Sequence, residues 1–153
     1  MEALNKYLQQ AYGDTSAWYE MAQLRLCLGD YSGASFALEE VILGCPSEAK
    51  IHLELAECYA TIGGVEKLTL ARKHMAQALE LEPTNRRAQL GLVSVANSYL
   101  EEALSSKKNA DEYEIQVAKE LVRYGAEQAL KSYKGTGMFA AVQSLMKEYT
   151  DAL

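Results

Sequence analysis

The sequence of 153 residues has little proline and little cysteine: two prolines, Pro46 and Pro83, and three cysteines. It also lacks an apolar run as long as the roughly 18–20 residues of a membrane-spanning helix, and its first residues show no basic stretch followed by an apolar core, as a signal peptide would. Because proline breaks helices, its scarcity beside many Ala, Leu, Glu, Gln and Lys residues favours a helical chain. The two prolines are 37 residues apart, and this spacing suggests a repeat.

Cysteine and histidine usage argues against a disulfide framework and against a metal site. The number of cysteines is odd, and Cys27, Cys45 and Cys58 are nowhere spaced as C-x-x-C. Only two histidines, His52 and His74, accompany them, so the ligand spacing of a zinc site is missing. We interpret the cysteines as reduced thiols that act as small apolar side chains. We predict no metal and no other cofactor.

The charge pattern argues against nucleic acid as a partner. The chain carries 21 acidic and 15 basic residues, a formal net charge of −6. The basic residues are scattered, and Arg72-Lys73, Arg86-Arg87 and Lys107-Lys108 are the only adjacent pairs. A nucleic-acid surface needs a basic stripe or patch, so we predict no nucleic-acid partner.

The sequence contains no recognisable catalytic motif. A Ser–His–acid set, a phosphate-binding loop and the H-E-x-x-H pattern of zinc proteases are all missing. We interpret His52 as a partly buried helix residue in a packing position and His74 as exposed. We therefore predict that the protein is not an enzyme.

A repeat of two helices runs from Trp18 to Pro46. A bulky residue, a large apolar residue and a small residue come first, then a glycine turn, then small and apolar residues at helical spacing up to the proline. This is the order of the tetratricopeptide signature. In a second copy, His52 takes the place of Trp18, and three extra residues within Gly63–Thr69 account for the longer proline spacing. We expect Gly29 and Gly63 to adopt the positive φ that ends a helix.

The predicted fold is all-α: a tetratricopeptide-repeat α-solenoid, a right-handed superhelix of antiparallel helix pairs, with a C-terminal capping helix. A third, degenerate copy has a polar loop at Ser105–Ala110 and a helix that starts at the N-cap Asp111, with Glu114 in a capping-box-like position. We expect one array over 1–153: the second helix of a truncated repeat (1–13), a repeat (14–46), a repeat with a turn insertion (47–83), a degenerate repeat (84–134) and the capping helix (136–153).

The helix predicted at the start of the chain, around Leu4 and Leu8, has the pattern of the second helix of a pair, and the first helix of that pair is absent from the sequence. We interpret the chain as the later part of a longer protein, with a natural chain that has an odd leading helix as the alternative.

The stretch from Gly63 to Leu81 resembles the central repeat of one particular family, subunit 2 of the endoplasmic reticulum membrane protein complex. The resemblance rests on the double glycine Gly63-Gly64, the lengthened turn, Ala71-Arg72-Lys73 at the entry to the second helix and Ala76-Gln77-Ala78-Leu79 at its exit. It begins near Leu4, extends to about Leu92, and is weak beyond Ser105.

This resemblance implies a non-catalytic scaffold subunit that is cytosolic and peripheral on the cytoplasmic face of the endoplasmic reticulum membrane, without a membrane span of its own. The complex of that family inserts tail-anchored and multipass proteins into the membrane. The implied partners are other subunits of the complex, including a globular cytosolic subunit and cytosolic segments of membrane-embedded subunits.

Repeat geometry predicts which residues line the concave face of the array. The first helices of successive pairs lie along this face, and a protein segment is held there by side-chain contacts. The predicted partner-binding groove comprises Tyr19, Gln23, Leu26, Lys50, Leu53, Glu57, Ala60, Arg87, Leu90, Ser94 and Asn97.

Two alternatives remain at this stage. A generic tetratricopeptide co-chaperone adaptor would hold a C-terminal carboxylate with converging Lys, Arg and Asn side chains, but Glu57 lies in the middle of the groove and Lys50 and Arg87 lie apart from each other. The final helix carries Phe139, Leu145 and other apolar residues that could touch a bilayer; with Lys147 as its only base, we assign it instead to capping the core.

Overall fold

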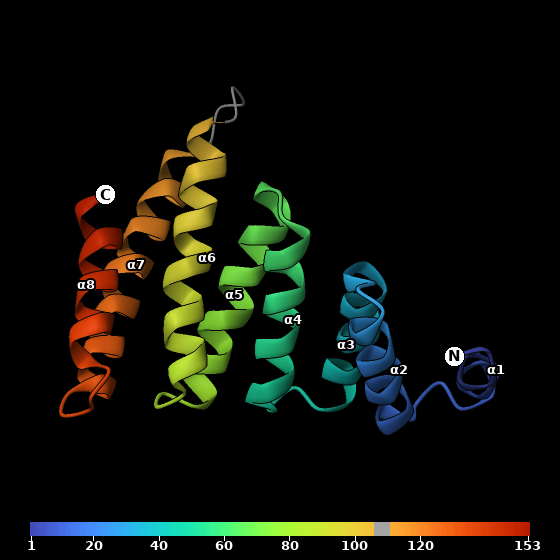
Figure 1. The fold of residues 1–153 in the computed structure, drawn as a ribbon. Coiled ribbons are helices and arrows are strands. Elements are labelled where there is room, and N and C mark those ends of the chain that lie inside the picture. Colours follow the sequence, from blue (N-terminus) through green and yellow to red (C-terminus); the bar gives the residue numbers. More distant parts are fainter. Residues whose placement is uncertain (106–110) are drawn as a thin grey trace.

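A computed structural model describes residues 1–105 and 111–153, and these residues form eight α-helices and no strand (Figure 1). The helices are α1 (Glu2–Gln10), α2 (Thr15–Cys27), α3 (Tyr31–Gly44), α4 (Ala49–Ile62), α5 (Val65–Leu81), α6 (Arg86–Ser105), α7 (Glu112–Tyr133) and α8 (Phe139–Asp151). The polar loop predicted for Ser105–Ala110 lies outside the described residues except for Ser105, which ends α6. No helix in the described residues is long and apolar enough to cross a membrane.

The helices stack as pairs in chain order, which confirms the predicted all-α solenoid. The most extensive contacts are within the pairs α2–α3, α4–α5 and α6–α7 and between consecutive pairs, and Figure 1 shows the pairs side by side along one direction. At one end, α8 packs against α7 and buries Val142 and Met146. At the other end, α1 has few contacts with α2 and buries Leu8.

Small residues at the signature positions let the helices approach closely. Ala22, Ala34, Ala56 and Ala71 are completely buried, and they alternate with large buried side chains such as Leu55. Dense packing of this kind leaves no room for larger side chains at the crossings. The core therefore runs the length of the array instead of forming a single centre.

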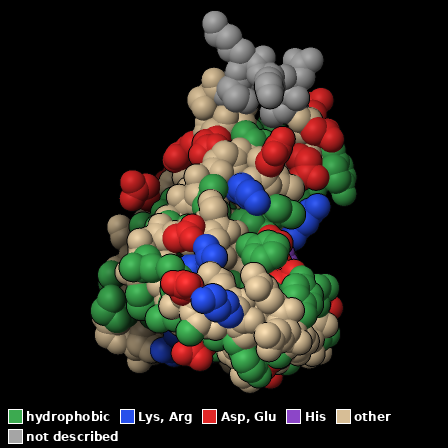
Figure 2. Space-filling view, turned by 90° about the vertical axis from the view of Figure 1, so that its right-hand side faces the viewer, with side chains coloured by type: hydrophobic (Ala, Val, Ile, Leu, Met, Phe, Trp, Pro, Cys, Tyr) green, Lys and Arg blue, Asp and Glu red, His purple; other side chains and the backbone are tan. Residues whose placement is uncertain are grey.

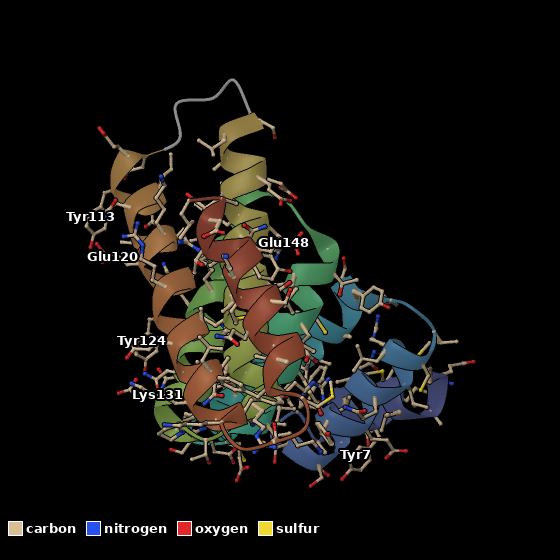
Figure 3. The ribbon with its side chains drawn as sticks, turned by 60° about the vertical axis from the view of Figure 1, so that its left-hand side comes forward. Tyr7, Tyr113, Glu120, Tyr124, Lys131 and Glu148 are labelled. Atoms are coloured by element: carbon tan, nitrogen blue, oxygen red, sulfur yellow. The ribbon has the colours of Figure 1, made fainter. Side chains whose placement is uncertain are left out.

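The degenerate third pair has a glycine at a close contact between its two helices. Gly125 of α7 is buried against α6, and a Cβ added to it would lie 2.7 Å from Cγ2 of Val93. The buried face of α7 also includes Ala118 and Val122. Figure 3 shows the opposite face of α7, where Tyr113, Glu120, Tyr124 and Lys131 point outward.

The predicted turn glycines have the expected backbone. Gly29 has φ 72° and Gly63 has φ 75°, both in the region that favours glycine. Gly64 also has a positive φ, 86°, and α5 begins directly after it at Val65. Most of the predicted turn insertion Gly63–Thr69 therefore lies inside α5, which has 17 residues where the equivalent α3 has 14. The extra residues therefore lengthen the second helix at its start, and the first turns of this helix bury Leu68 in the core.

Aspartate side chains cap the starts of α2 and α7, but the capping box predicted for α7 is incomplete. The Asp14 side chain accepts hydrogen bonds from the backbone N–H groups of Ser16 and Ala17 at the start of α2. Asp111 accepts from the N–H of Tyr113 at 3.0 Å, as predicted for α7. Glu114 does not reach back to complete a capping box; its carboxylate accepts a hydrogen bond from Arg72 at 2.7 Å, because an arginine buried on α5 attracts it more strongly.

Candidate partner-binding groove

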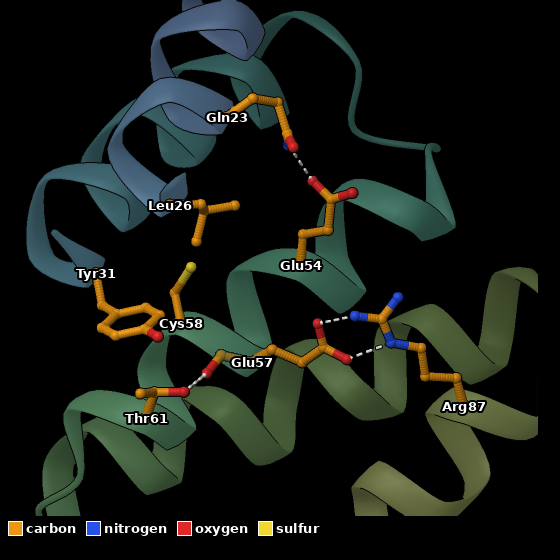
Figure 4. Close-up of a pocket in the computed structure, with 8 residues that line it drawn as sticks. All are labelled: Gln23, Leu26, Tyr31, Glu54, Glu57, Cys58, Thr61 and Arg87. Carbon is orange, nitrogen blue, oxygen red and sulfur yellow. Dashed lines mark hydrogen bonds and ion pairs between the residues drawn. The ribbon is translucent and has the colours of Figure 1, made fainter. Parts of the chain in front are cut away.

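The predicted groove residues come from three neighbouring helices, and the structure brings four of them into one pocket. Gln23 and Leu26 project from α2, Glu57 from α4 and Arg87 from α6, and all four line a pocket of about 320 Å³ (Figure 4). We name it the Glu54–Glu57 pocket. Its other lining residues, which the sequence reasoning missed, are Tyr31, Glu54, Cys58 and Thr61.

Two more predicted residues lie at a second, neighbouring pocket of about 320 Å³. Tyr19 and Lys50 line it together with residues of α3 and of the segment between α3 and α4. Lys50 Nζ lies 5.1 Å from the centre of the Tyr19 ring, a cation–π distance. Tyr19 and, after it, the Glu54 carboxylate raise the pKa of Lys50.

The remaining predicted residues do not line either pocket. Leu53 is buried in the core and is not a groove residue, because α4 has α3, α5 and α6 as neighbours and little of its surface stays open. Ala60 and Leu90 are half-buried and pack against the core. Ser94 is exposed, and the Asn97 amide donates a hydrogen bond to Glu101 at 2.8 Å.

The missed residue Glu54 is the most connected polar group of the groove. Its two carboxylate oxygens accept hydrogen bonds from the Tyr19 hydroxyl at 3.1 Å and from the Gln23 amide at 3.0 Å. The ammonium group of Lys50 lies 3.8 Å away. Glu54 stands four residues after Lys50, the spacing of neighbours on one helix face, and this signal could have identified it in the sequence.

Glu57 and Arg87 join α4 to α6 across the groove. The Arg87 guanidinium donates two hydrogen bonds to the two Glu57 oxygens, each 2.6 Å long. This bidentate geometry is the strongest that an arginine and a carboxylate can form. The pair is partly exposed, since the side chains are 67% and 34% accessible, so it can still exchange partners.

The two histidines, on α4 and α5, form a hydrogen-bonded pair. His52 is buried in the packing position, and its Nε2 lies 2.9 Å from the carbonyl oxygen of Pro46. That oxygen can only accept, so Nε2 carries the proton and Nδ1 accepts from Nδ1–H of His74 at 3.0 Å. The expectation that His74 is exposed is wrong: it is half-buried because its ring stacks on His52.

The histidine pair predicts that the protein loses stability as the pH falls. Burial and, second, the neighbouring His52 lower the pKa of His74, and Glu39 of α3 opposes them; the Tyr59 ring of α4 also faces it. Because the unfolded chain then binds a proton more readily than the folded one, the stabilisation is present above pH 6.5 and is lost below it. Thermal melting at pH 7.5 and pH 5.5 measures the loss.

The variant His74→Gln is the control for this pH dependence. Glutamine keeps a polar group at the position but does not titrate, so its melting temperature should fall less between the two pH values. An equal fall in both proteins would contradict the assignment to His74.

The stacked helix pairs define the protein as a tetratricopeptide-type helical solenoid. Its backbone is similar to a solved structure of MamA, with a TM-score of 0.58 over 98% of this chain and 84% of that chain. The sequence identity is 15%, so this likeness concerns the fold alone.

Sequence comparisons point to one family. Residues 1–67 match the family model described as the EMC2 TPR-like repeat domain. The chain is 36% identical over 155 residues to ER membrane protein complex subunit 2-A of Xenopus laevis. This alignment covers 98% of this chain and 49% of that protein. It is 46% identical over 89 residues to subunit 2 of Xenopus tropicalis (58% of this chain, 30% of that protein), and 30% identical over 120 residues to subunit 2 of Dictyostelium discoideum (71% and 37%).

These matches confirm the resemblance noted in the sequence: the chain is a member of the family of ER membrane protein complex subunit 2. It spans about half the length of the curated relatives it matches.

Proposed function

We propose that the chain is a non-catalytic scaffold subunit of the endoplasmic reticulum membrane protein complex, and that its concave repeat surface holds other subunits. The observation that carries this proposal is the similarity to subunit 2, which extends over 98% of the chain and includes the helices that form the groove. The groove supports it, because side chains from α2, α3, α4 and α6 meet in a single pocket.

The proposed partners are a globular cytosolic subunit and cytosolic segments of membrane-embedded subunits. The corresponding location is the cytosolic side of the endoplasmic reticulum membrane, with peripheral attachment through these partners. The proposed task of the assembly is to insert tail-anchored and multipass proteins. A surface of mixed polar and apolar groups supports such contacts, and Figure 2 shows charged groups of both signs interspersed with apolar side chains on one end of the array.

A scaffold without catalysis is consistent with the chemistry of the groove. Among the described residues, no group of three or more His, Cys, Asp and Glu side chains is arranged to hold a metal ion. The Cys58 thiol in the pocket is a poor nucleophile, since burial first and the carboxylates of Glu54 and Glu57 next raise its pKa to about 11.

The groove gives less support to the alternative of a co-chaperone adaptor. Such a clamp needs cationic groups that converge on a carboxylate. Here Arg87 is held by Glu57, and Lys50 lies beside Glu54. A peptide carboxylate would have to displace these acidic partners.

Affinity purification of the tagged chain from solubilised cell membranes tests the proposed function. We expect a multi-subunit assembly of the endoplasmic reticulum membrane to be recovered with it. Recovery of chaperones alone would contradict the scaffold and favour the adaptor.

A charge-reversed variant, Glu57→Lys, tests the role of the groove in the same experiment. It should fold normally, because the pair with Arg87 is partly exposed, and recover less of the assembly. Glu20→Lys, on the exposed face of α2 and outside the pocket, is the matched control. Equal recovery with Glu57→Lys and with Glu20→Lys would show that the groove does not hold the other subunits. It would leave the assignment of the chain as a subunit of the complex intact.

A further inference from the structure

The Glu54–Glu57 pocket has an apolar wall. Leu26 of α2, the buried Cys58 of α4 and the ring of Tyr31 at the start of α3 line one side of it (Figure 4). Its volume of about 320 Å³ is at the lower end of the roughly 300–1,000 Å³ of ligand pockets. A cavity of this size suits one long side chain of a partner better than a cofactor.

The other side of the pocket carries two carboxylates and one cation. Glu54 and Glu57 lie three residues apart and therefore on the same face of α4, and the only basic residue of the lining is Arg87. The lining thus has a formal charge of −1. The same two carboxylates contribute to the raised pKa of Cys58, so their field extends into the pocket.

Glu54 is the carboxylate whose charge is least compensated. Both hydrogen bonds to its oxygens come from neutral donors, Tyr19 and Gln23. The cation nearest to it, Lys50, is 3.8 Å away and two-thirds exposed, whereas the Glu54 side chain is 14% exposed. A carboxylate offers about four acceptor positions, so Glu54 can still accept from an incoming cation.

Lysine and arginine combine the two properties that this pocket requires. Their aliphatic stems bury along apolar surface while their charged ends stay beside polar groups. An acidic side chain would face two carboxylates with Arg87 already engaged by Glu57. A purely apolar side chain would make the surroundings of Glu54 less polar and leave the largely exposed Lys50, 3.8 Å away, as its counter-ion.

We infer that the Glu54–Glu57 pocket binds a lysine or arginine side chain of a protein partner, with the stem along Leu26 and Cys58 and the cationic end at the two carboxylates. This inference rests on the proposed function, in which the groove holds segments of other subunits. It adds the chemistry of the segment: a basic residue at the centre of the contact.

Binding of synthetic peptides to the purified chain tests the pocket without any other subunit. The probes are three fluorescein-labelled nonapeptides, Ser-Ala-Leu-Ala-X-Ala-Leu-Ala-Ser, in which X is lysine, glutamine or glutamate. Fluorescence anisotropy at low salt should show the lysine peptide binding about fivefold more tightly than the glutamine peptide, and the glutamate peptide more weakly than both.

Variants of the two carboxylates assign the preference to the pocket. The double variant Glu54→Gln with Glu57→Gln should lose the preference for lysine, while Glu20→Gln, an exposed change on α2, should keep it. Lys50→Gln should leave the preference unchanged or increase it, because it removes the cation nearest to Glu54.

Three results would overturn the inference: tightest binding of the glutamate peptide, an unchanged lysine preference in the double variant, or no measurable binding of any peptide. None of them bears on whether the tagged chain recovers an endoplasmic reticulum assembly. The failure of this inference is therefore distinguishable from the failure of the proposed function.

Discussion

Replacement of Leu55 by alanine is expected to lower the free energy of unfolding by about 2–5 kcal/mol. Leu55 is completely buried on α4, and α4 contacts α3, α5 and α6. The removed methyl and methylene groups would leave a cavity that helices fixed on several sides cannot close. For a chain of this length, each kcal/mol corresponds to a fall of roughly 2–4 °C in melting temperature, and thermal unfolding followed by circular dichroism measures it.

Leu43→Ala is the matched control for this prediction. Leu43 is also a helical leucine, on α3, but it is 78% exposed. Its replacement should change the stability by less than about 0.5 kcal/mol. Similar losses in the two variants would show that α4 does not have the central position in which the structure places it.

Replacement of Glu114 by alanine is expected to cost about 3 kcal/mol, because it leaves a buried arginine without its counter-ion. Arg72 is 3% exposed and donates to the Glu114 carboxylate at 2.7 Å. Its guanidinium also lies 3.8 Å from the centre of the Tyr99 ring. Within the described residues its Nε has no hydrogen-bond partner. The ion pair with Glu114 therefore supplies most of the stabilisation of the buried positive charge. Urea unfolding measures the loss as a lower midpoint with an unchanged m-value.

The variant Arg72→Met distinguishes this mechanism from a simple loss of contacts. Methionine fills much of the same volume against Tyr99 and carries no charge that needs a partner. The Glu114 side chain, about one-third exposed, can then be hydrated. We expect Arg72→Met to cost about half as much as Glu114→Ala. A larger loss in Arg72→Met would indicate that the packing of the arginine, and not its buried charge, determines the effect.

The fold was predictable from local signals that need no knowledge of distant contacts. The order of bulky, small and turn residues from Trp18 to Pro46 predicts a helix pair, and Ala22 and Ala34 are indeed buried where helices cross. The positive φ of Gly29 and Gly63 follows from the same signature. These features are predictable because each repeat contacts only its neighbours, so its sequence pattern is also its packing pattern.

The groove was less predictable, because side chains from different helices meet there. Projection of the first helices identified Gln23, Leu26, Glu57 and Arg87 of the Glu54–Glu57 pocket but missed Glu54 itself, one position away from the chosen face of α4. It also missed Tyr31, because this residue begins a second helix, α3.

The sequence by itself determined the class of the fold, the order of the helix pairs and the family, because helix signals and repeat signatures are local. The tertiary structure alone decided which charges meet. It joined Glu57 to Arg87 across 30 residues and Arg72 to Glu114 across 42, and it stacked His74 on His52. Such pairs depend on the distance and rotation between neighbouring helices, to which side-chain packing along the whole interface contributes. The scarce prolines marked the ends of the repeats, but the chemistry of the groove became visible only when the pairs were placed side by side.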